Sequence, residues 1–282
     1  MNVRAPVFAM QGWYPFNREE CNRTLEGFFR SFNGRLGSYG GIVPHAGWVF
    51  SGKLAAWTFE ALRSTNPEVV FLFGGHLGVS NRPVCMTQGA WGTPLGEVEV
   101  HEELARQIAQ RFDCLMETPD KFEPDNTIEL QMPILKKIWP EAKVVAVQVP
   151  PRPETMAMGQ WAATKAKENG LVAIAVGSTD LTHYGSPYGF EPKGSGYEAH
   201  RWSKEQNDRG FLDRLMELDV DKAVEHALLN RSACCPGAAG ATAMFAKQMG
   251  AKKGELIEHL TSYEIDGSGK PSMWVGYASM VF

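Results

Sequence analysis

The sequence predicts an α/β fold in which a mixed or mostly parallel sheet is flanked by helices. Apolar runs rich in β-branched residues, such as VVFLF and LVAIAV, alternate along the chain with segments of helical periodicity. These runs are apolar almost throughout, which is typical of strands that are covered on both faces. The 282 residues contain no internal repeat and no linker, so we expect a single domain over residues 1–282.

Five short runs predict strands in the first two thirds of the chain. Apolar and β-branched residues dominate them, and glycine, proline or polar residues bound them. The predicted strands are Tyr39–Pro44, Val69–Phe73, Val84–Gln88, Val144–Val149 and Leu171–Val176.

Between these strands, apolar residues recur three or four positions apart, which predicts helices that pack one face on the sheet. In the first of them, Leu54, Trp57 and Leu62 fall on the inner side. The predicted helices are Gly52–Arg63, Glu99–Phe112, Thr127–Ile138 and Glu154–Asn169.

The last third of the chain has a different pattern. Tyr197–Leu218 predicts a long polar helix, and Val220–Leu229 a shorter one. Pro236–Met249 is rich in glycine and alanine and begins with proline, which predicts a helix that packs closely on its neighbours. Two strands, Glu255–Tyr263 and Trp274–Val281, then close the fold.

Composition excludes several classes of protein. Lys and Arg number 28 against 32 Asp and Glu, a net charge of −4, so the basic excess of a nucleic-acid-binding protein is missing. No apolar run approaches the roughly 18 residues of a membrane-spanning helix, and the N-terminus does not resemble a signal peptide. The five cysteines form no CxxC pair, which favours free thiols and a cytoplasmic location.

Histidines and a carboxylate follow three of the predicted strands. His45 follows the first strand, His76 the second, and Asp180 and His183 the last. If these strands are parallel, their carboxyl ends share one edge of the sheet, where α/β proteins bind ligands. A single histidine after a strand usually caps or packs. Three on one edge favour a metal site or an acid–base site.

The four other histidines fall in helical or charged contexts, which favours a solvated surface position for each of them. They are His101, His200, His226 and His259.

The adjacent cysteines Cys234 and Cys235 precede Pro236, so a thiol lies near a helix N-terminus. The helix dipole and the free N–H groups there favour the thiolate, which is a soft metal ligand. The alternative is a buried structural cysteine beside a tight turn. Because neighbouring cysteines do not easily bind one metal together, we expect one to act and the other to pack.

Two further features leave alternatives open. Either Glu129 lies in the first turn of a helix capped by Thr127, where the dipole favours an anion, or Glu129 or Asn126 points into the same crevice. Four aromatic residues either wall a flat substrate or pack in the core, and core packing is the commoner role. These residues are Trp13, Tyr14, Trp48 and Tyr184.

Eight stretches resemble, in the same order, the motifs of one known family, and together they cover nearly the whole chain. They are Gly12-Trp13-Tyr14-Pro15, Pro44-His45-Ala46-Gly47-Trp48 with Ser51-Gly52, Phe73-Gly74-Gly75-His76, Thr93-Pro94-Leu95-Gly96, Thr127–Pro133, Ser178–Gly185, Ala233-Cys234 and Gly276-Tyr277-Ala278. The sequence thus resembles the MEMO family, whose bacterial and archaeal members are called AmmeMemoRadiSam system protein B.

The resemblance implies a fold similar to class III extradiol dioxygenases and a metal held by His45, His76 and Cys234. It implies Fe(II) as the metal and Asp180 and His183 as a pair of site residues, and a thiolate ligand would also suit Cu or Zn. It also implies AMMECR1-like and radical-SAM partner proteins. At three positions this chain departs from the family pattern: the family usually has histidine at Leu77 and Asn126 and glycine at Cys235.

Three functions follow as hypotheses. The first is a non-haem Fe(II) dioxygenase that acts with O₂ on a small substrate such as an aromatic diol, with His183, Asp180, Glu129 and Asn126 in the catalytic site. The second is a non-catalytic metal-binding or peptide-interaction protein. The third is a hydrolase with a nucleophilic cysteine. Neither a nucleic-acid partner nor a membrane partner is expected.

Overall fold

The computed structural model describes residues 2–34 and 36–282. Its strands coincide closely with the apolar runs of the sequence, and it adds short strands that the pattern does not predict. The strands are β1 Val3–Arg4, β2 Gly40–Val43, β3 Val69–Gly74, β4 Val84–Met86, β5 Ala90–Thr93, β6 Gly96–Glu99, β7 Leu115–Glu117, β8 Lys143–Gln148, β9 Ala173–Ser178, β10 His183–Tyr184, β11 Glu255–Thr261 and β12 Trp274–Val281.

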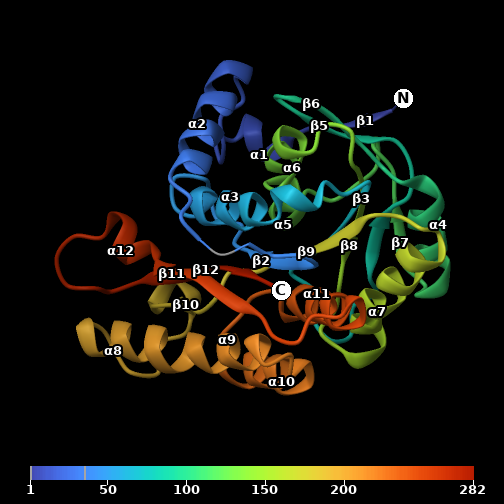
Figure 1. Ribbon diagram of the computed structural model, residues 1–282. Helices are drawn as coiled ribbons and strands as arrows, with labels where there is room; N and C mark the ends of the chain where they lie inside the picture. Colours follow the sequence, from blue (N-terminus) through green and yellow to red (C-terminus); the bar gives the residue numbers. More distant parts are fainter. Residues whose placement is uncertain (1, 35) are drawn as a thin grey trace.

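Helices lie on both faces of the main sheet (Figure 1). They are α1 Val7–Met10, α2 Arg18–Arg30, α3 Gly52–Ala61, α4 Glu102–Arg111, α5 Asn126–Glu129, α6 Met132–Ile138, α7 Pro153–Glu168, α8 Tyr197–Trp202, α9 Arg209–Met216, α10 Val220–Asn230, α11 Pro236–Met249 and α12 Ser262–Asp266. Short 3₁₀ turns cover Arg63–Thr65 and Ser186–Tyr188, and a π-helix covers Ser203–Asp208.

The main sheet is mixed, with a parallel centre. Within the described residues it has nine strands in the order β10-β12-β2-β9-β3-β8-β4-β7, and β11 pairs with β12. The central strands β2, β9, β3 and β8 are parallel, whereas β12 and β4 run antiparallel to their inner neighbours. A separate three-stranded sheet has the order β1-β5-β6. The α/β fold with a mixed sheet between helices is therefore confirmed.

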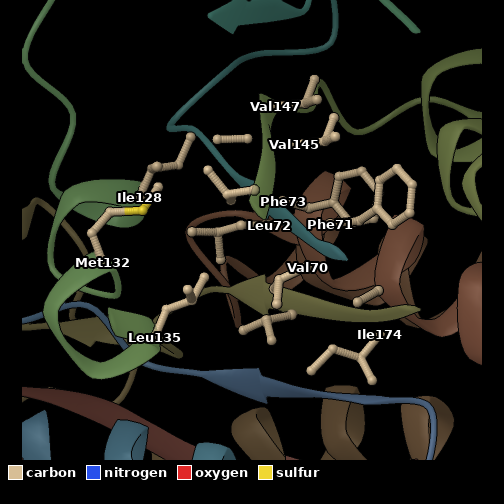
Figure 2. Packing of buried hydrophobic residues seen from close by; sticks show 14 of the residues in the cluster. Val70, Phe71, Leu72, Phe73, Ile128, Met132, Leu135, Val145, Val147 and Ile174 are labelled. Carbon is tan, nitrogen blue, oxygen red and sulfur yellow. The ribbon is translucent and has the colours of Figure 1, made fainter. Parts of the chain in front are cut away.

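The central strands are buried on both faces, which explains their continuous apolar sequences. All six residues of β3 are buried. Figure 2 shows its side chains Val70–Phe73 among those of Ile128 and Met132, which come from α5 and α6, and those of Val145 and Val147 on the neighbouring β8. On the other face, Phe71 meets Phe245 of α11 at 5.8 Å between ring centroids.

Close packing of the small-residue helix is confirmed. A Cβ atom at Gly159 of α7 would lie 1.7 Å from the carbonyl oxygen of Ala241 of α11, so the two helices touch along their backbones. A Cβ atom at Gly237 would lie 2.1 Å from the carbonyl oxygen of Val149, directly after β8. The glycines therefore bring the start of α11 down onto the carboxyl edge of the sheet.

Three predicted helices differ in the structure. The helix predicted from Glu99 begins at Glu102, because Gly96–Glu99 pairs with β5 and His101 caps the helix. The helix predicted over Thr127–Ile138 is divided into α5 and α6. The predicted helix Tyr197–Leu218 contains the π-helix in its middle.

The N-terminal helices α1 and α2 were not predicted. Helix α2 is capped by the side chain of Asn17, which accepts the N–H of Glu20, but its sequence is too polar to stand out. In the described part of the chain, no helix is long and apolar enough to cross a membrane.

The surface prediction for the four remaining histidines is wrong for His259. It is only 8% exposed, and its Nε2 lies 2.9 Å from Oδ2 of the buried Asp208. His200 and His226 are half-buried with hydroxyl partners, Thr261 and Ser232. Tertiary packing thus buries polar positions that the local pattern assigns to the surface.

Candidate metal centre

The carboxyl ends of three adjacent parallel strands bring the predicted site residues to one edge of the sheet. β2 leads to His45, β3 to His76, and β9 to Asp180 and His183. β2, β9 and β3 are neighbours and parallel, which confirms the strand direction that the predicted site requires. All four residues line one cavity of about 1350 Å³.

A tight turn after β3 carries His76. Gly75 has φ +95°, and a Cβ atom there would lie 2.4 Å from Cβ of Gln148, so the turn requires glycine. The N–H of Gly75 donates to Oγ1 of Thr127 at 2.8 Å. Helix α5 therefore holds the backbone from which the exposed His76 reaches the cavity.

His45 is held at its ring and at its backbone. Its Nδ1 lies 3.0 Å from Oγ of Ser178, and its backbone N–H donates to Oδ1 of Asp180 at 2.7 Å. Nδ2 of Asn126 donates to its carbonyl oxygen at 3.0 Å. A partner at Nδ1 fixes the ring orientation and leaves Nε2 as the atom that can bind a metal.

Three donor atoms converge in front of β2 and β3. Nε2 of His45 lies 3.2 Å from Nε2 of His76 and 3.3 Å from Sγ of Cys234. Atoms that bind one transition metal at 2.0–2.3 Å are roughly 3.0–3.8 Å apart. The separations therefore fit a shared ion, and this His–Cys cluster could hold one.

Cys234 lies between the end of β9 and the start of α11. Its N–H donates to the carbonyl oxygen of Asp180 at 3.1 Å, and its Sγ accepts the N–H of Asp180 at 3.2 Å. Cys235 is the N-cap residue of α11, and its Sγ lies 3.6 Å from that of Cys234. Both sulfurs thus belong to the cluster, whereas the sequence predicts that one of them only packs.

The charged forms of the groups in this cluster stabilise one another. Burial lowers the pKa of His45, but the Asp180 carboxylate and the Cys234 thiolate outweigh it and raise this pKa to about 9. Burial acts to raise the pKa of Cys234, yet S–H donation from Cys235 and the nearby imidazoles hold it well below its usual range. The site therefore favours a thiolate, the form of cysteine that binds metals.

Asp180 and His183 lie together beside the cluster. Oδ2 of Asp180 is 3.9 Å from Nε2 of His183 and 3.8 Å from Nε2 of His45. Burial raises the pKa of Asp180. Burial opposes protonation of His183, but the Cys234 thiolate and Asp180 raise its pKa. Within the described residues, Nε2 of His183 is buried and has no hydrogen-bond partner, so it is available to a ligand.

Asn126 and Glu129 occupy different places. Asn126 lines the cavity and holds the His45 backbone. Glu129 is buried, and its carboxylate accepts the N–H groups of Val7 and Phe8 at 3.0 and 2.7 Å and the hydroxyl of Tyr14 at 3.1 Å. It is absent from the cavity lining found among the described residues. Glu129 therefore anchors the N-terminal segment to α5.

Aromatic side chains form much of the cavity wall. Trp13, Tyr14 and Trp48 line it, and the rings of Tyr14 and Trp48 also pack in the core, 5.2 Å apart. Tyr184 does not line it. Its ring stacks on Trp274, as the core role predicts. Near His183 the cavity is lined instead by Tyr188, whose ring centroid lies 5.1 Å from that of His183.

Two neighbours of the site were missed by the sequence analysis. Ser178 fixes the His45 ring, and Oγ1 of Thr179 accepts the N–H of Cys235 at 3.0 Å. Both directly follow the apolar part of β9. The rule that selected Asp180 from its place after the strand would have found them, had hydroxyl residues been included.

Comparisons with known proteins agree on one family. The chain matches the family described as "Memo-like protein" over residues 4–281. It is 33% identical to a MEMO1 family protein of Pyrococcus abyssi and 31% identical to one of Nitrosopumilus maritimus, each over 99% of both chains. The solved structure of uncharacterized protein JW3007 from Escherichia coli K12 aligns with a TM-score of 0.49 and 11% identity, over 86% of this chain and 99% of that chain. That likeness is too distant to bear on function.

Proposed function

Because the chain belongs to the Memo-like protein family, we propose that its His–Cys cluster holds a catalytic metal ion and that the protein is an oxygenase. The metal of this proposal is Fe(II), and the substrate is a small molecule such as an aromatic diol. The observation that carries the proposal is the convergence of Nε2 of His45, Nε2 of His76 and Sγ of Cys234 beside a large cavity.

The donor set suits a redox-active ion. Imidazoles bind iron, copper and zinc, and a thiolate binds soft or borderline ions more tightly than oxygen ligands do. Bound Fe(II) would supply the electrons that activate O₂ for insertion into an aromatic ring. The protein's part is to hold the ion at the cavity and to fix the ligands through Ser178, Asp180 and Asn126.

His183 is the residue that moves a proton in this proposal. An aromatic diol must lose a hydroxyl proton before its oxygen becomes a strong metal ligand and its ring becomes reactive. Nε2 of His183 is buried and has no partner in the described part of the chain, and Asp180 lies 3.9 Å away. The carboxylate stabilises the imidazolium that forms when His183 accepts that proton.

The cavity wall supports a flat substrate. Trp13, Trp48 and Tyr188 line the cavity, and the volume of about 1350 Å³ exceeds the roughly 300–1,000 Å³ of common small-molecule pockets. A single-ring diol would fill only the part nearest His45 and His183. The wall therefore has room for a substituent on the ring.

The proposal is tested by O₂ uptake with Fe(II)-loaded protein on a panel of catechols. Wild-type protein consumes O₂ with at least one of them, and His183→Ala keeps the iron but loses about 10²–10⁴-fold in turnover. Loss of iron in His183→Ala would make this residue a ligand. Stoichiometric iron without turnover on the panel would instead support a non-catalytic metal-binding protein.

A second candidate, a cysteine-dependent hydrolase, is favoured by one observation. Sγ of Cys234 lies 3.3 Å from Nε2 of His45, a thiolate–imidazole pair of the kind that nucleophilic cysteines use. Ester hydrolysis that survives a metal chelator and is abolished by iodoacetamide would support this candidate over the oxygenase.

A further inference from the structure

The metal cluster contains one sulfur more than the family pattern requires. Sγ of Cys235 lies 3.6 Å from Sγ of Cys234, and all four potential ligand atoms, including those of His45 and His76, lie within 4.8 Å of one another. Two thiolates that share one tetrahedral ion at about 2.3 Å are roughly 3.8 Å apart. The sulfur pair therefore has nearly the spacing of two ligands of one ion.

The local backbone holds both sulfurs in place. Cys234 is tied to the end of β9 through the carbonyl oxygen and the N–H of Asp180, and the N–H of Cys235 donates to Oγ1 of Thr179. Pro236 then starts α11 directly after Cys235. Because both cysteines are pinned to the same strand end, their side chains meet although adjacent residues commonly diverge.

The sulfur of Cys235 has few polar interactions with the rest of the protein. It is 1% exposed, and in the described part of the chain the one hydrogen-bonding contact of its Sγ is Cys234. A thiol is a weak hydrogen-bond donor, so the contact with Cys234 by itself contributes little to stability. A thiol beside three metal-binding groups can serve as a fourth metal ligand.

We propose that Cys235 is a fourth ligand, so that one ion is bound by two imidazoles and two thiolates. The inference rests on the metal site proposed above but not on the oxygenase reaction. On binding a divalent ion, the S–H bond of Cys235 breaks, its proton passes to solvent and a metal–sulfur bond forms. The ion undergoes no change of oxidation state.

The fourth ligand changes what the site can hold. Two thiolates favour thiophilic ions such as Zn(II) and Cu(I) over harder ions. Among the described residues, the cavity lining includes His45 and His76 but neither cysteine, so the sulfurs lie on the side of the cluster away from the cavity. An ion that takes four ligands is then saturated by the protein, whereas one that takes six keeps two positions for other molecules.

Cobalt(II) spectroscopy counts the thiolates. In metal-free protein titrated with Co(II), the sulfur-to-cobalt charge-transfer band grows with the number of cobalt–thiolate bonds. Wild-type protein binds one Co(II) per chain, and Cys235→Ala also binds one but with about half the band intensity. The matched control Cys21→Ser, which removes a buried thiol outside the cluster, leaves the band unchanged.

X-ray absorption of zinc-loaded wild-type protein gives the same count without a variant, with two sulfur neighbours expected. Undiminished charge-transfer intensity in Cys235→Ala, or one sulfur neighbour in the wild type, overturns the fourth ligand while leaving the three-ligand site intact. Absence of bound Co(II) and Zn(II) from the wild type overturns the metal site and this inference with it. Lack of O₂ uptake would affect only the oxygenase proposal.

Discussion

Two polar clusters flank the loop that carries His183, and they differ in how their polar atoms are satisfied. One is the metal cluster of His45, His76, Cys234 and Cys235. The other, here called the sealed cluster, consists of Thr182, Asn207, Asp208 and His259. Both contain imidazole and a group that can carry negative charge, yet only the first opens onto the cavity.

In the sealed cluster each side chain has a protein partner. Oδ1 of Asp208 accepts the N–H and the hydroxyl of Thr182, and Oδ2 lies 2.9 Å from Nε2 of His259. Nδ2 of Asn207 donates to Oγ1 of Thr182 at 2.9 Å. Asp208 and Asn207 reach Thr182 from the π-helix Ser203–Asp208.

The metal cluster and its neighbour His183 are the opposite case. The neighbours of Nε2 of His45 are themselves potential metal ligands, Nε2 of His76 at 3.2 Å and Sγ of Cys234 at 3.3 Å, and Nε2 of His183 is buried without a hydrogen-bond partner in the described residues. Satisfied buried groups stabilise a fold, whereas converging unsatisfied ones mark the place where something else binds. We therefore expect substitutions in the sealed cluster to lower the stability of the fold, and substitutions in the metal cluster to lower metal binding.

The largest effect on stability is expected from Asp208→Ala. It leaves the hydroxyl and N–H of Thr182 and the ring of His259 without their buried partner, which costs about 3–5 kcal/mol in the free energy of unfolding. Urea denaturation measures the loss. The control Asp213→Ala removes a half-exposed ion pair with Arg209 and costs about 1 kcal/mol or less. A loss equal to that of the control would show that the sealed cluster is not structural.

A smaller effect is expected from Glu129→Gln. The amide keeps one acceptor oxygen but turns an NH₂ group toward backbone N–H donors, which costs about 1–3 kcal/mol. Because Glu129 holds Val7 and Phe8, the N-terminal segment should also become accessible to proteases at residues 7–16. Glu19→Gln, on the exposed face of α2, is the control. Normal protease resistance in Glu129→Gln would contradict the anchoring role.

Alkylation by iodoacetamide separates Cys234 from the core cysteines. Its pKa is held low, whereas burial raises the pKa of Cys21 and Cys114 to about 12. In metal-free protein Cys234 is therefore labelled at pH 7, and its rate changes little as the pH rises. The thiolate fraction of Cys21 and Cys114 grows about tenfold per pH unit below their pKa. Mass spectrometry gives the rates, and equal labelling of Cys234 with and without metal would count against coordination.

Local signals marked His45, His76 and Cys234 as candidate site residues, and the resemblance to the MEMO family implied that they bind one metal. His45 and His76 follow apolar strands, and Cys234 lies close to a helix-starting proline. The direction of the strands, which decides whether the histidines meet, was an assumption that the structure confirms.

The sealed cluster could not be predicted, because no local signal marks it. His259 lies in the polar run ELIEHLT, which resembles an exposed strand, and Asp208 lies in a polar helix. Their burial depends on the π-helix, which brings Asp208 to Thr182, and on Gly276, where a Cβ atom would lie 2.4 Å from Oδ2 of Asp208. The proximity of the two sulfurs was not predicted for the same reason, since only the tertiary structure shows that the side chains of Cys234 and Cys235 meet.

The metal content of anaerobically purified protein tests the central claim most directly. His76 is exposed, so His76→Ala should fold normally, and His259→Gln alters an imidazole of the sealed cluster instead. Elemental analysis is predicted to find one transition-metal ion per chain in the wild type and in His259→Gln, and almost none in His76→Ala. Full metal occupancy in His76→Ala would contradict the account, because the cluster of His45, His76, Cys234 and Cys235 would then not be the metal site.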